Sequence, residues 1–287
     1  MAVFLVLGSV VSLQFGAAFA SQLFGQIGAP GATALRLGIA ALMLAVVTKP
    51  KFRQETVVLG LTMAGMNGTF YLALDRIPLG VAVTIEFLGP LGVAAVLSRR
   101  PRDFVWVGLA LVGVVILGVR EYTGAHLDLI GVVLALLAAA FWACYVLAGR
   151  RLATEGLGTG GLAGASLVAA ALTLPYGLST AGAALFEPRT LMLGAVVALL
   201  ASAIPYTLEI RALKTLQAGT FGVALALEPA AAALAGAVLL GQHLSLISLC
   251  AIALVITAGV GAALSTAPAS RETPAPRDAD LVLPVPR

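Results

Sequence analysis

Two glutamates lie inside long apolar segments, and each has a proline close behind it. Glu86 stands four residues before Pro90, and Glu228 immediately precedes Pro229. A proline has no N–H, so in a helix it leaves the carbonyl four residues earlier without its donor. A carboxyl group removed from water favours its protonated form. Each glutamate could therefore bind a cationic group or carry a proton; the alternative is a neutral side chain hydrogen-bonded to a neighbouring helix.

Arg36 and Glu209 are the other charged candidates in or beside apolar segments. The Arg36 guanidinium could extend to the outer headgroups, or it could face the interior and hold the carboxylate of a substrate or of a glutamate. Glu209 precedes Arg211 and Lys214, so a simple loop position is its alternative. Uncharged side chains expected to line the same pocket are Gln14, Asn67, Tyr71, Tyr145 and Tyr206. Hydrogen bonding between helices is the alternative for these five.

The composition indicates that most of this chain lies in lipid. Of its 287 residues, 60% are hydrophobic and 10% are charged, and the mean hydropathy is +1.05. Ordinary globular proteins have about 45–50% apolar and about 25% charged residues. A soluble fold of this size has too little interior to bury so much apolar surface.

Residue patterns that are typical of several other protein classes are missing from the sequence. Cys144 and Cys250 both lie in apolar runs, which excludes a disulfide framework, and His126 and His243 are too far apart for a zinc site. We find no nucleophile elbow, no metalloprotease motif and no phosphate-binding loop. We therefore expect no enzyme, no cofactor and no metal. The thinly spread basic residues also argue against a nucleic-acid partner.

Ten apolar segments are long enough to cross a bilayer as helices. Crossing takes about 20 residues, and lipid offers backbone groups no hydrogen-bond partners, so helix is required. The predicted spans are 2–23, 31–48, 56–74, 79–98, 103–119, 128–149, 160–181, 190–208, 219–240 and 244–265. In the first span Gly8, Ser12, Gly16 and Ala20 recur every four residues, forming a stripe that a neighbouring helix can approach. The predicted fold is an all-α polytopic membrane bundle.

Basic residues predict the orientation of this bundle. The even-numbered connections and the C-terminal tail hold 13 of the 17 Lys and Arg residues. The odd-numbered connections hold Arg76, Arg120 and Arg189. Cytoplasmic loops carry the excess of basic residues, so both termini are expected in the cytoplasm, which requires an even number of spans.

The second half of the sequence weakly repeats the first. The segment 15–19, Phe-Gly-Ala-Ala-Phe, corresponds to Phe-Trp-Ala-Cys-Tyr at 141–145, and Pro90 corresponds to Pro229. Five spans in each half would give two repeats of opposite orientation, an architecture suited to alternating access. We predict one repeat over 1–125, a second over 126–265, and a disordered cytoplasmic tail over 266–287, which contains five prolines.

Several strings resemble the drug/metabolite transporter superfamily of EamA type, especially its bacterial threonine and homoserine exporters. These strings occupy residues 28–31, 33–37, 65–67, 77–80, 86–91, 204–209 and 227–230. The resemblance covers nearly the whole chain except the tail. One position departs from it, because members often have Gly-Glu where this chain has Gly241-Gln242.

The resemblance implies a secondary transporter that exports small amino acids by proton antiport from a bacterial inner membrane. Family motif positions are occupied here by Gln14, Arg36, Asn67, Glu86, Glu209 and Glu228. We expect Glu86 and Arg36 to hold the ammonium and carboxylate of a zwitterion, with Glu228, and Glu86 itself, carrying protons. Export of another metabolite or a drug is the alternative, and a membrane scaffold without transport would need longer loops. The sequence leaves a homodimer open.

Overall fold

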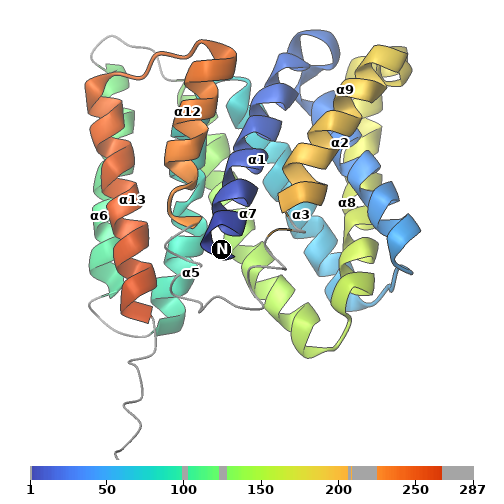
Figure 1. The fold of residues 1–287 in the computed structure, drawn as a ribbon, viewed down its shortest axis with the longest axis horizontal. Coiled ribbons are helices and arrows are strands. Elements are labelled where there is room, and N and C mark those ends of the chain that lie inside the picture. Colours follow the sequence, from blue (N-terminus) through green and yellow to red (C-terminus); the bar gives the residue numbers. More distant parts are fainter. Residues whose placement is uncertain (1, 99–102, 123–127, 206–207, 209–224, 267–287) are drawn as a thin grey trace, which may run out of the picture.

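The computed structural model describes residues 2–98, 103–122, 128–205, 208 and 225–266, and within them every regular element is a helix (Figure 1). The first half contains α1 (Ala2–Gln22), α2 (Phe24–Val47), α3 (Gln54–Leu74), α4 (Leu79–Glu86), α5 (Leu88–Ser98) and α6 (Asp103–Tyr122). The second half contains α7 (Leu129–Thr154), α8 (Gly158–Ala181), the 3₁₀ turn η1 (Gly182–Phe186), α9 (Pro188–Ala198), the π turn η2 (Leu199–Ala203), α12 (Glu228–Leu240) and α13 (Leu246–Thr266).

Each predicted span coincides with an apolar helical segment. Five segments, in α1, α2, α3, α7 and α8, are long and apolar enough to cross a membrane on their own. Five shorter apolar segments occupy residues 79–93, 104–116, 188–202, 228–240 and 246–262. The predicted all-α membrane bundle of ten spans is thereby confirmed.

The chain is sharply bent just before the predicted start of the second span at residue 31. Helix α2 begins at Phe24 and passes through a kink at Gly28, whose φ of +67° is a left-handed conformation that suits glycine. Pro30 follows the kink, where its missing N–H removes no regular helical bond. In the helical part that follows the kink, Arg36 lies eight residues after Gly28 and eleven before Val47.

The fourth and ninth spans are interrupted where the sequence predicts proline kinks. Helix α4 ends at Glu86, a turn at Phe87 follows, and α5 begins at Leu88 with Pro90 in its first turn. Helix α12 begins at Glu228 after a turn at residues 226 and 227, so the predicted span 219–240 is interrupted just before this residue. Residues 219–224 of that span lie outside the described part of the chain.

The helices of the two halves pack in equivalent pairs. The second helices of the halves, α2 and α8, pack on each other, and so do α6 and α13. Helix α1 contacts α9, η2 and α12, whereas its counterpart α7 contacts α3, α4 and α5. Exchanging the halves therefore reproduces these pairings, as expected for two repeats of opposite orientation. The predicted boundary at residues 125 and 126 lies outside the described residues and stays a prediction.

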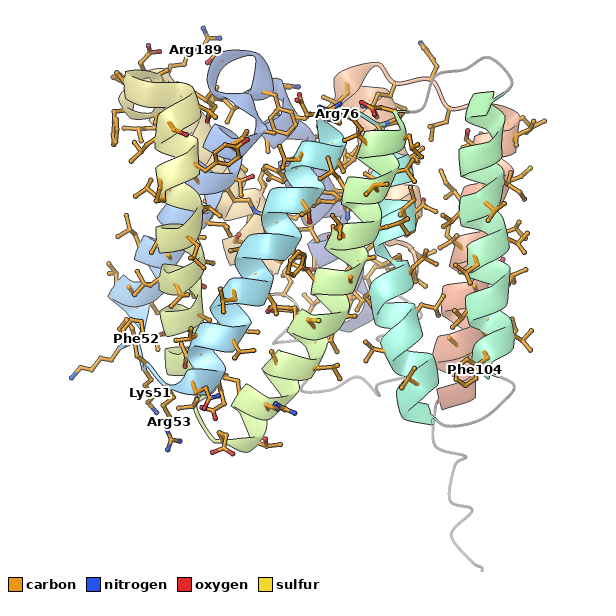
Figure 2. The ribbon with its side chains drawn as sticks, turned by 180° about the vertical axis from the view of Figure 1, so that it is seen from behind. Lys51, Phe52, Arg53, Arg76, Phe104 and Arg189 are labelled. Atoms are coloured by element: carbon orange, nitrogen blue, oxygen red, sulfur yellow. The ribbon has the colours of Figure 1, made fainter. Side chains whose placement is uncertain are left out.

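Basic residues of even-numbered and odd-numbered connections lie at opposite ends of the bundle, as the sequence predicts. Lys51 and Arg53 lie at one end, and Arg76 and Arg189 lie at the opposite end (Figure 2). The described chain begins and ends on the half of the bundle that carries Lys51 (Figures 1 and 2). The helical segments thus cross the bundle an even number of times.

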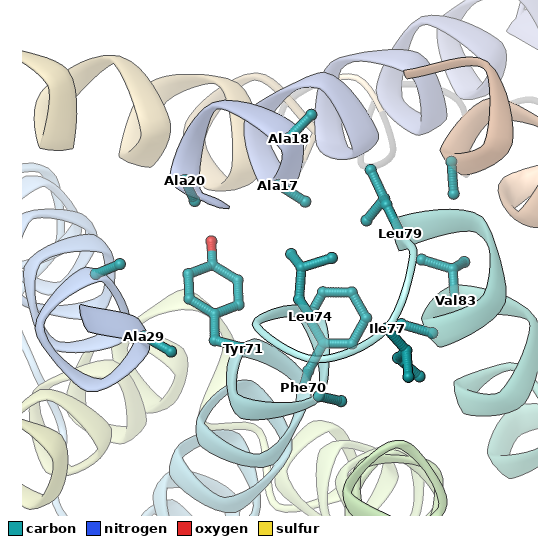
Figure 3. Packing of buried hydrophobic residues seen from close by; sticks show 14 of the residues in the cluster. Ala17, Ala18, Ala20, Ala29, Phe70, Tyr71, Leu74, Ile77, Leu79 and Val83 are labelled. Atoms are coloured by element: carbon teal, nitrogen blue, oxygen red, sulfur yellow. The ribbon is translucent and has the colours of Figure 1, made fainter. Parts of the chain in front are cut away.

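A dense apolar cluster fills the end of the bundle that carries Arg76. Leu74, Ile77 and Leu79 surround the connection between α3 and α4 and are all buried. Ala17 of α1 points toward Leu74 (Figure 3), and Ala18 and Ala20 belong to the same cluster and have no exposed surface. The interior of the bundle is closed toward this end.

Candidate transport site

A cavity of about 230 Å³ lies below the apolar cluster, inside the bundle. Side chains from α1, α2, α3, α4, α7, η2 and α12 line it, so both halves contribute. The predicted site residues among them are Gln14, Arg36, Asn67, Glu86, Tyr145 and Glu228. These residues come from six helices and are spread over 215 positions of sequence, and the fold brings them to one pocket.

Arg36 faces the interior of the bundle. Its Nη1 donates to the Tyr71 hydroxyl at 3.3 Å, and its Nη2 donates to the Ala201 carbonyl at 3.0 Å. The guanidinium carbon also lies 5.5 Å from the centre of the Tyr71 ring, within cation–π distance. Of the two sequence interpretations, the structure therefore supports the inward one over extension to the headgroups.

Glu86 is the last residue of α4 and is 8% exposed. Its carbonyl lacks the usual helical donor because Pro90 stands four residues later, and the chain turns at Phe87 before α5. Arg36 and Glu86 both line the pocket, from α2 and α4. A cationic and a carboxyl group thus face one small cavity.

Glu228 lines the same cavity from the other half and is 4% exposed. It lies in the first turn of α12, directly before Pro229, which has no N–H to donate to the Leu225 carbonyl four residues earlier. The free N–H groups of a helix N-terminus favour a nearby negative charge. The backbone therefore lowers the cost of an ionised carboxylate at this position.

Uncharged polar groups complete the lining. Asn67 donates from Nδ2 to the Met63 carbonyl at 2.9 Å, which orients its amide and leaves Oδ1 available as an acceptor. Gln14 is buried in α1 and Tyr145 is half-buried in α7, and both border the cavity. These groups can pair with polar atoms of a ligand.

Among the predicted site residues that the structure describes, Tyr71 does not border the cavity. Tyr71 is fully buried between Phe24 and Phe70, and it contacts Arg36 instead of the cavity. Tyr206 and Glu209 lie outside the described residues, so their predicted roles stay predictions.

Apolar lining residues were missed by the search for polar side chains. Met66, Phe70 and Trp142 border the cavity, and the Trp142 ring meets Phe87 edge-on at 6.4 Å. Trp142 belongs to the segment 141–145 of the internal repeat, and this repeat was the sequence feature that could have identified it as a lining residue. Pro205 also lines the cavity, and the rule applied to Pro90 would have pointed from it to Ala201.

Gln242, the departure from the family pattern, joins the two interrupted spans at the closed end. Its Oε1 accepts a hydrogen bond from the Leu79 N–H at 3.1 Å, and Leu79 opens α4. The neutral amide satisfies one of the free N–H groups at that helix terminus.

Chemically, the cavity offers a fixed guanidinium, two carboxyl groups and several amide or hydroxyl groups in surroundings that are otherwise apolar. The described residues include no group of three His, Cys, Asp or Glu side chains that could hold a metal ion. The arrangement suits a small ligand that carries both charges.

A multi-pass helical bundle with charged and polar groups around an internal cavity is the architecture expected of a membrane transporter. This chain belongs to the EamA-like transporter family, whose model matches residues 129–264. It is 43% identical over 268 residues to the threonine/homoserine exporter RhtA of Escherichia coli K12, covering 91% of this chain and 90% of that protein. The exporter of the same name from Salmonella typhimurium LT2 is 43% identical over 270 residues, with 92% and 91% covered.

A solved crystal structure shows the same fold. That protein is 24% identical, with a TM-score of 0.60, and the match covers 92% of this chain and 98% of its own. Family membership confirms the predicted family and makes the chain a transporter, not an enzyme.

Proposed function

We propose that this protein exports small amino acids of the threonine and homoserine type across a bacterial inner membrane, in exchange for protons. Relatives named threonine/homoserine exporters, 43% identical over nine-tenths of the chain, support the cargo class. The cavity volume of about 230 Å³ supports a small cargo, because pockets for drug-sized ligands begin at about 300 Å³.

The observation that carries the proposal is the presence of Arg36, Glu86 and Glu228 around one buried cavity. Arg36 binds the carboxylate of the amino acid with its planar guanidinium, and Glu86 receives the ammonium group. Glu228 takes up and releases the exchanged proton, and Glu86 shares in this when no cargo is bound. Gln14 and Asn67 pair with the remaining polar atoms of the cargo.

Further predicted residues act around this centre. Tyr145 contributes its hydroxyl to the cargo site, and Tyr71 acts through Arg36. Tyr206 and Glu209 belong to the site in this proposal on the strength of their motif positions alone.

Alternating access arises from the two halves moving against each other around the cavity. The end that carries Lys51 faces the cytoplasm, together with both termini, because basic residues concentrate on that side. The apolar cluster on the Arg76 side closes the outer path in this conformation.

Transport by purified protein in lipid vesicles tests the proposal. Glu86→Gln should lower proton-driven threonine or homoserine movement at least about tenfold, because a charge-assisted contact to the ammonium is lost. Glu187→Gln is the matched control, since Glu187 is exposed at the start of α9. Unchanged transport by Glu86→Gln would remove this residue from the mechanism.

One observation favours a second cargo class. Phe70, Trp142 and Tyr145 border the cavity, and aromatic rings bind organic cations and aromatic metabolites. A panel of labelled compounds in the same vesicles separates the two proposals. Movement of aromatic or cationic compounds without threonine or homoserine would favour the second.

A further inference from the structure

Two consecutive backbone carbonyls of the π turn η2 accept hydrogen bonds from side chains of other helices. In η2 the Ile204 N–H donates to the Leu199 carbonyl, one residue further back than in an α-helix. The Leu200 carbonyl therefore loses its regular donor. The Ser12 hydroxyl of α1 donates to it at 2.7 Å.

The next carbonyl, that of Ala201, lacks its α-helical donor for a different reason. Its donor in an α-helix would be the N–H of residue 205, and Pro205 has none. Arg36 Nη2 donates to this carbonyl at 3.0 Å. The π turn and the proline together thus present an acceptor to the guanidinium inside the bundle.

Tyr71 holds the other side of the same guanidinium. Its hydroxyl accepts from Nη1 at 3.3 Å, and its ring has no exposed surface. Arg36 is therefore attached to α3 and to η2 at once. Two attachments restrict a side chain that otherwise loses much rotamer entropy when it binds a ligand.

A glycine of α1 allows this arrangement. A Cβ added to Gly16 would lie 2.8 Å from both the backbone N and the Cβ of Ala201, which is closer than real Cβ contacts. The stripe predicted from Gly8, Ser12, Gly16 and Ala20 thus meets the segment that follows α9, which confirms it as a surface of close helix approach. Gly16 lets the π turn come near enough to reach Arg36.

We infer that Pro205 is a positioning residue. Together with the π turn, it holds the Arg36 guanidinium in the orientation that binds the carboxylate of the cargo. The inference rests on the proposed function, because it assigns Arg36 to the cargo carboxylate. A guanidinium that is held in place before binding loses less freedom when the ligand arrives, so the attachment sets affinity. The attachment of Arg36 therefore changes the affinity for the cargo and not the rate at which the two halves move.

Pro205→Ala tests the inference, because alanine supplies the N–H that can satisfy the Ala201 carbonyl and release Arg36. In vesicles the KM for the transported amino acid should rise about tenfold, as expected for one hydrogen bond to a charged group, while the maximal rate changes less than about twofold. Pro175→Ala is the matched control, since Pro175 lies inside α8, is exposed and does not border the cavity.

A double-mutant cycle separates positioning from a general effect on structure. In an Arg36→Lys background, Pro205→Ala should change KM less than about twofold, because the group that it releases is already gone. A rise in KM of the same size in both backgrounds would mean that Pro205 acts without Arg36, and the inference would be overturned.

A second pair of variants addresses the case in which Pro205→Ala fails to fold. Gly16→Ala should displace the π turn and raise KM in the same way. Gly8→Ala serves as its control, because a Cβ at Gly8 would make only an ordinary contact at 3.5 Å with Leu208. Equal KM values for the two glycine variants would contradict the inference.

A readout that needs no cargo distinguishes failure of this inference from failure of the proposed function. Phenylglyoxal modifies arginines, and mass spectrometry can follow the peptide that contains Arg36. Its modification should be several-fold faster in Pro205→Ala than in wild type or Pro175→Ala. An unchanged rate would overturn the inference whatever the cargo, whereas faster modification without threonine or homoserine transport would count against the proposed function only.

Discussion

Gly89→Ala should push α5 away from α7 and destabilise the protein. A Cβ at Gly89 would lie 2.1 Å from the Ala139 carbonyl oxygen and 2.9 Å from the carbonyl carbon. Ordinary C–H···O contacts begin at about 3.3 Å, so the helices must separate by roughly 1 Å. The obstructing atoms belong to helix backbone and cannot rotate away. Such overpacking costs about 1–3 kcal/mol.

Gly92→Ala on the same helix isolates this cost. A Cβ at Gly92 meets nothing within 4 Å. Both variants gain the helix propensity of alanine, about 1 kcal/mol per residue, so the difference between them is the overpacking cost alone. Chemical unfolding of the purified protein in detergent should therefore show Gly89→Ala to be less stable than Gly92→Ala by about 1–3 kcal/mol. Equal stability would refute the close approach of α5 to the α7 backbone.

Two further predictions concern the ends of the bundle. A hydrogen bond from the Arg76 guanidinium holds the pKa of Asp128 below its ordinary value. Because the folded pKa is the lower one, this pair stabilises the protein above about pH 4 and ceases to do so as the pH falls further. Between pH 6 and pH 3 the free energy of unfolding should therefore fall less for Asp128→Asn than for wild type. An equal decrease in both proteins would contradict this. In a cysteine-free background, Lys51→Cys should react with an impermeant maleimide only from the cytoplasmic side and Arg189→Cys only from the other; the reverse pattern would invert the proposed orientation.

The ten spans could be predicted because lipid imposes a simple length and composition on each of them. The sides of the loops followed from charge counting, and Lys51 and Arg189 lie at opposite ends of the bundle as expected. The direction of Arg36 could not be decided in the same way. It depends on which face of α2 packs toward α3 and η2, and the contacts of Arg36 with Tyr71 and Ala201 exist only in the folded structure.

The π turn could not be predicted from periodicity, because it changes the hydrogen-bond register without changing the apolar pattern. Its presence depends on contacts between distant segments, such as that of Ser12 with Leu200, which lie 188 residues apart. The role of Tyr71 was also open, since a tyrosine in an apolar span can face a cavity or a neighbouring side chain. Only the packing of α3 against α2 shows that its hydroxyl holds Arg36.

Three prolines in the spans indicate the position of the cavity. In three cases the residue four positions before a proline borders the cavity. These pairs are Pro90 with Glu86, Pro205 with Ala201 and Pro229 with Leu225. Backbone without its helical partner is tolerated at membrane depth only where protein groups or water can satisfy it.

A proline alone is not sufficient, however, because the residue four positions before Pro175 is Ala171, which is exposed and does not border the cavity. What distinguishes the three cavity prolines is a charged side chain that can reach the interrupted segment. Glu86 and Glu228 lie on such segments, and Arg36 reaches the third from α2. The combination of interrupted backbone with a nearby charge is therefore the feature that locates the site. An unpaired backbone carbonyl and a charged side chain are each unfavourable in the membrane interior, and when they lie together each can offset the cost of the other.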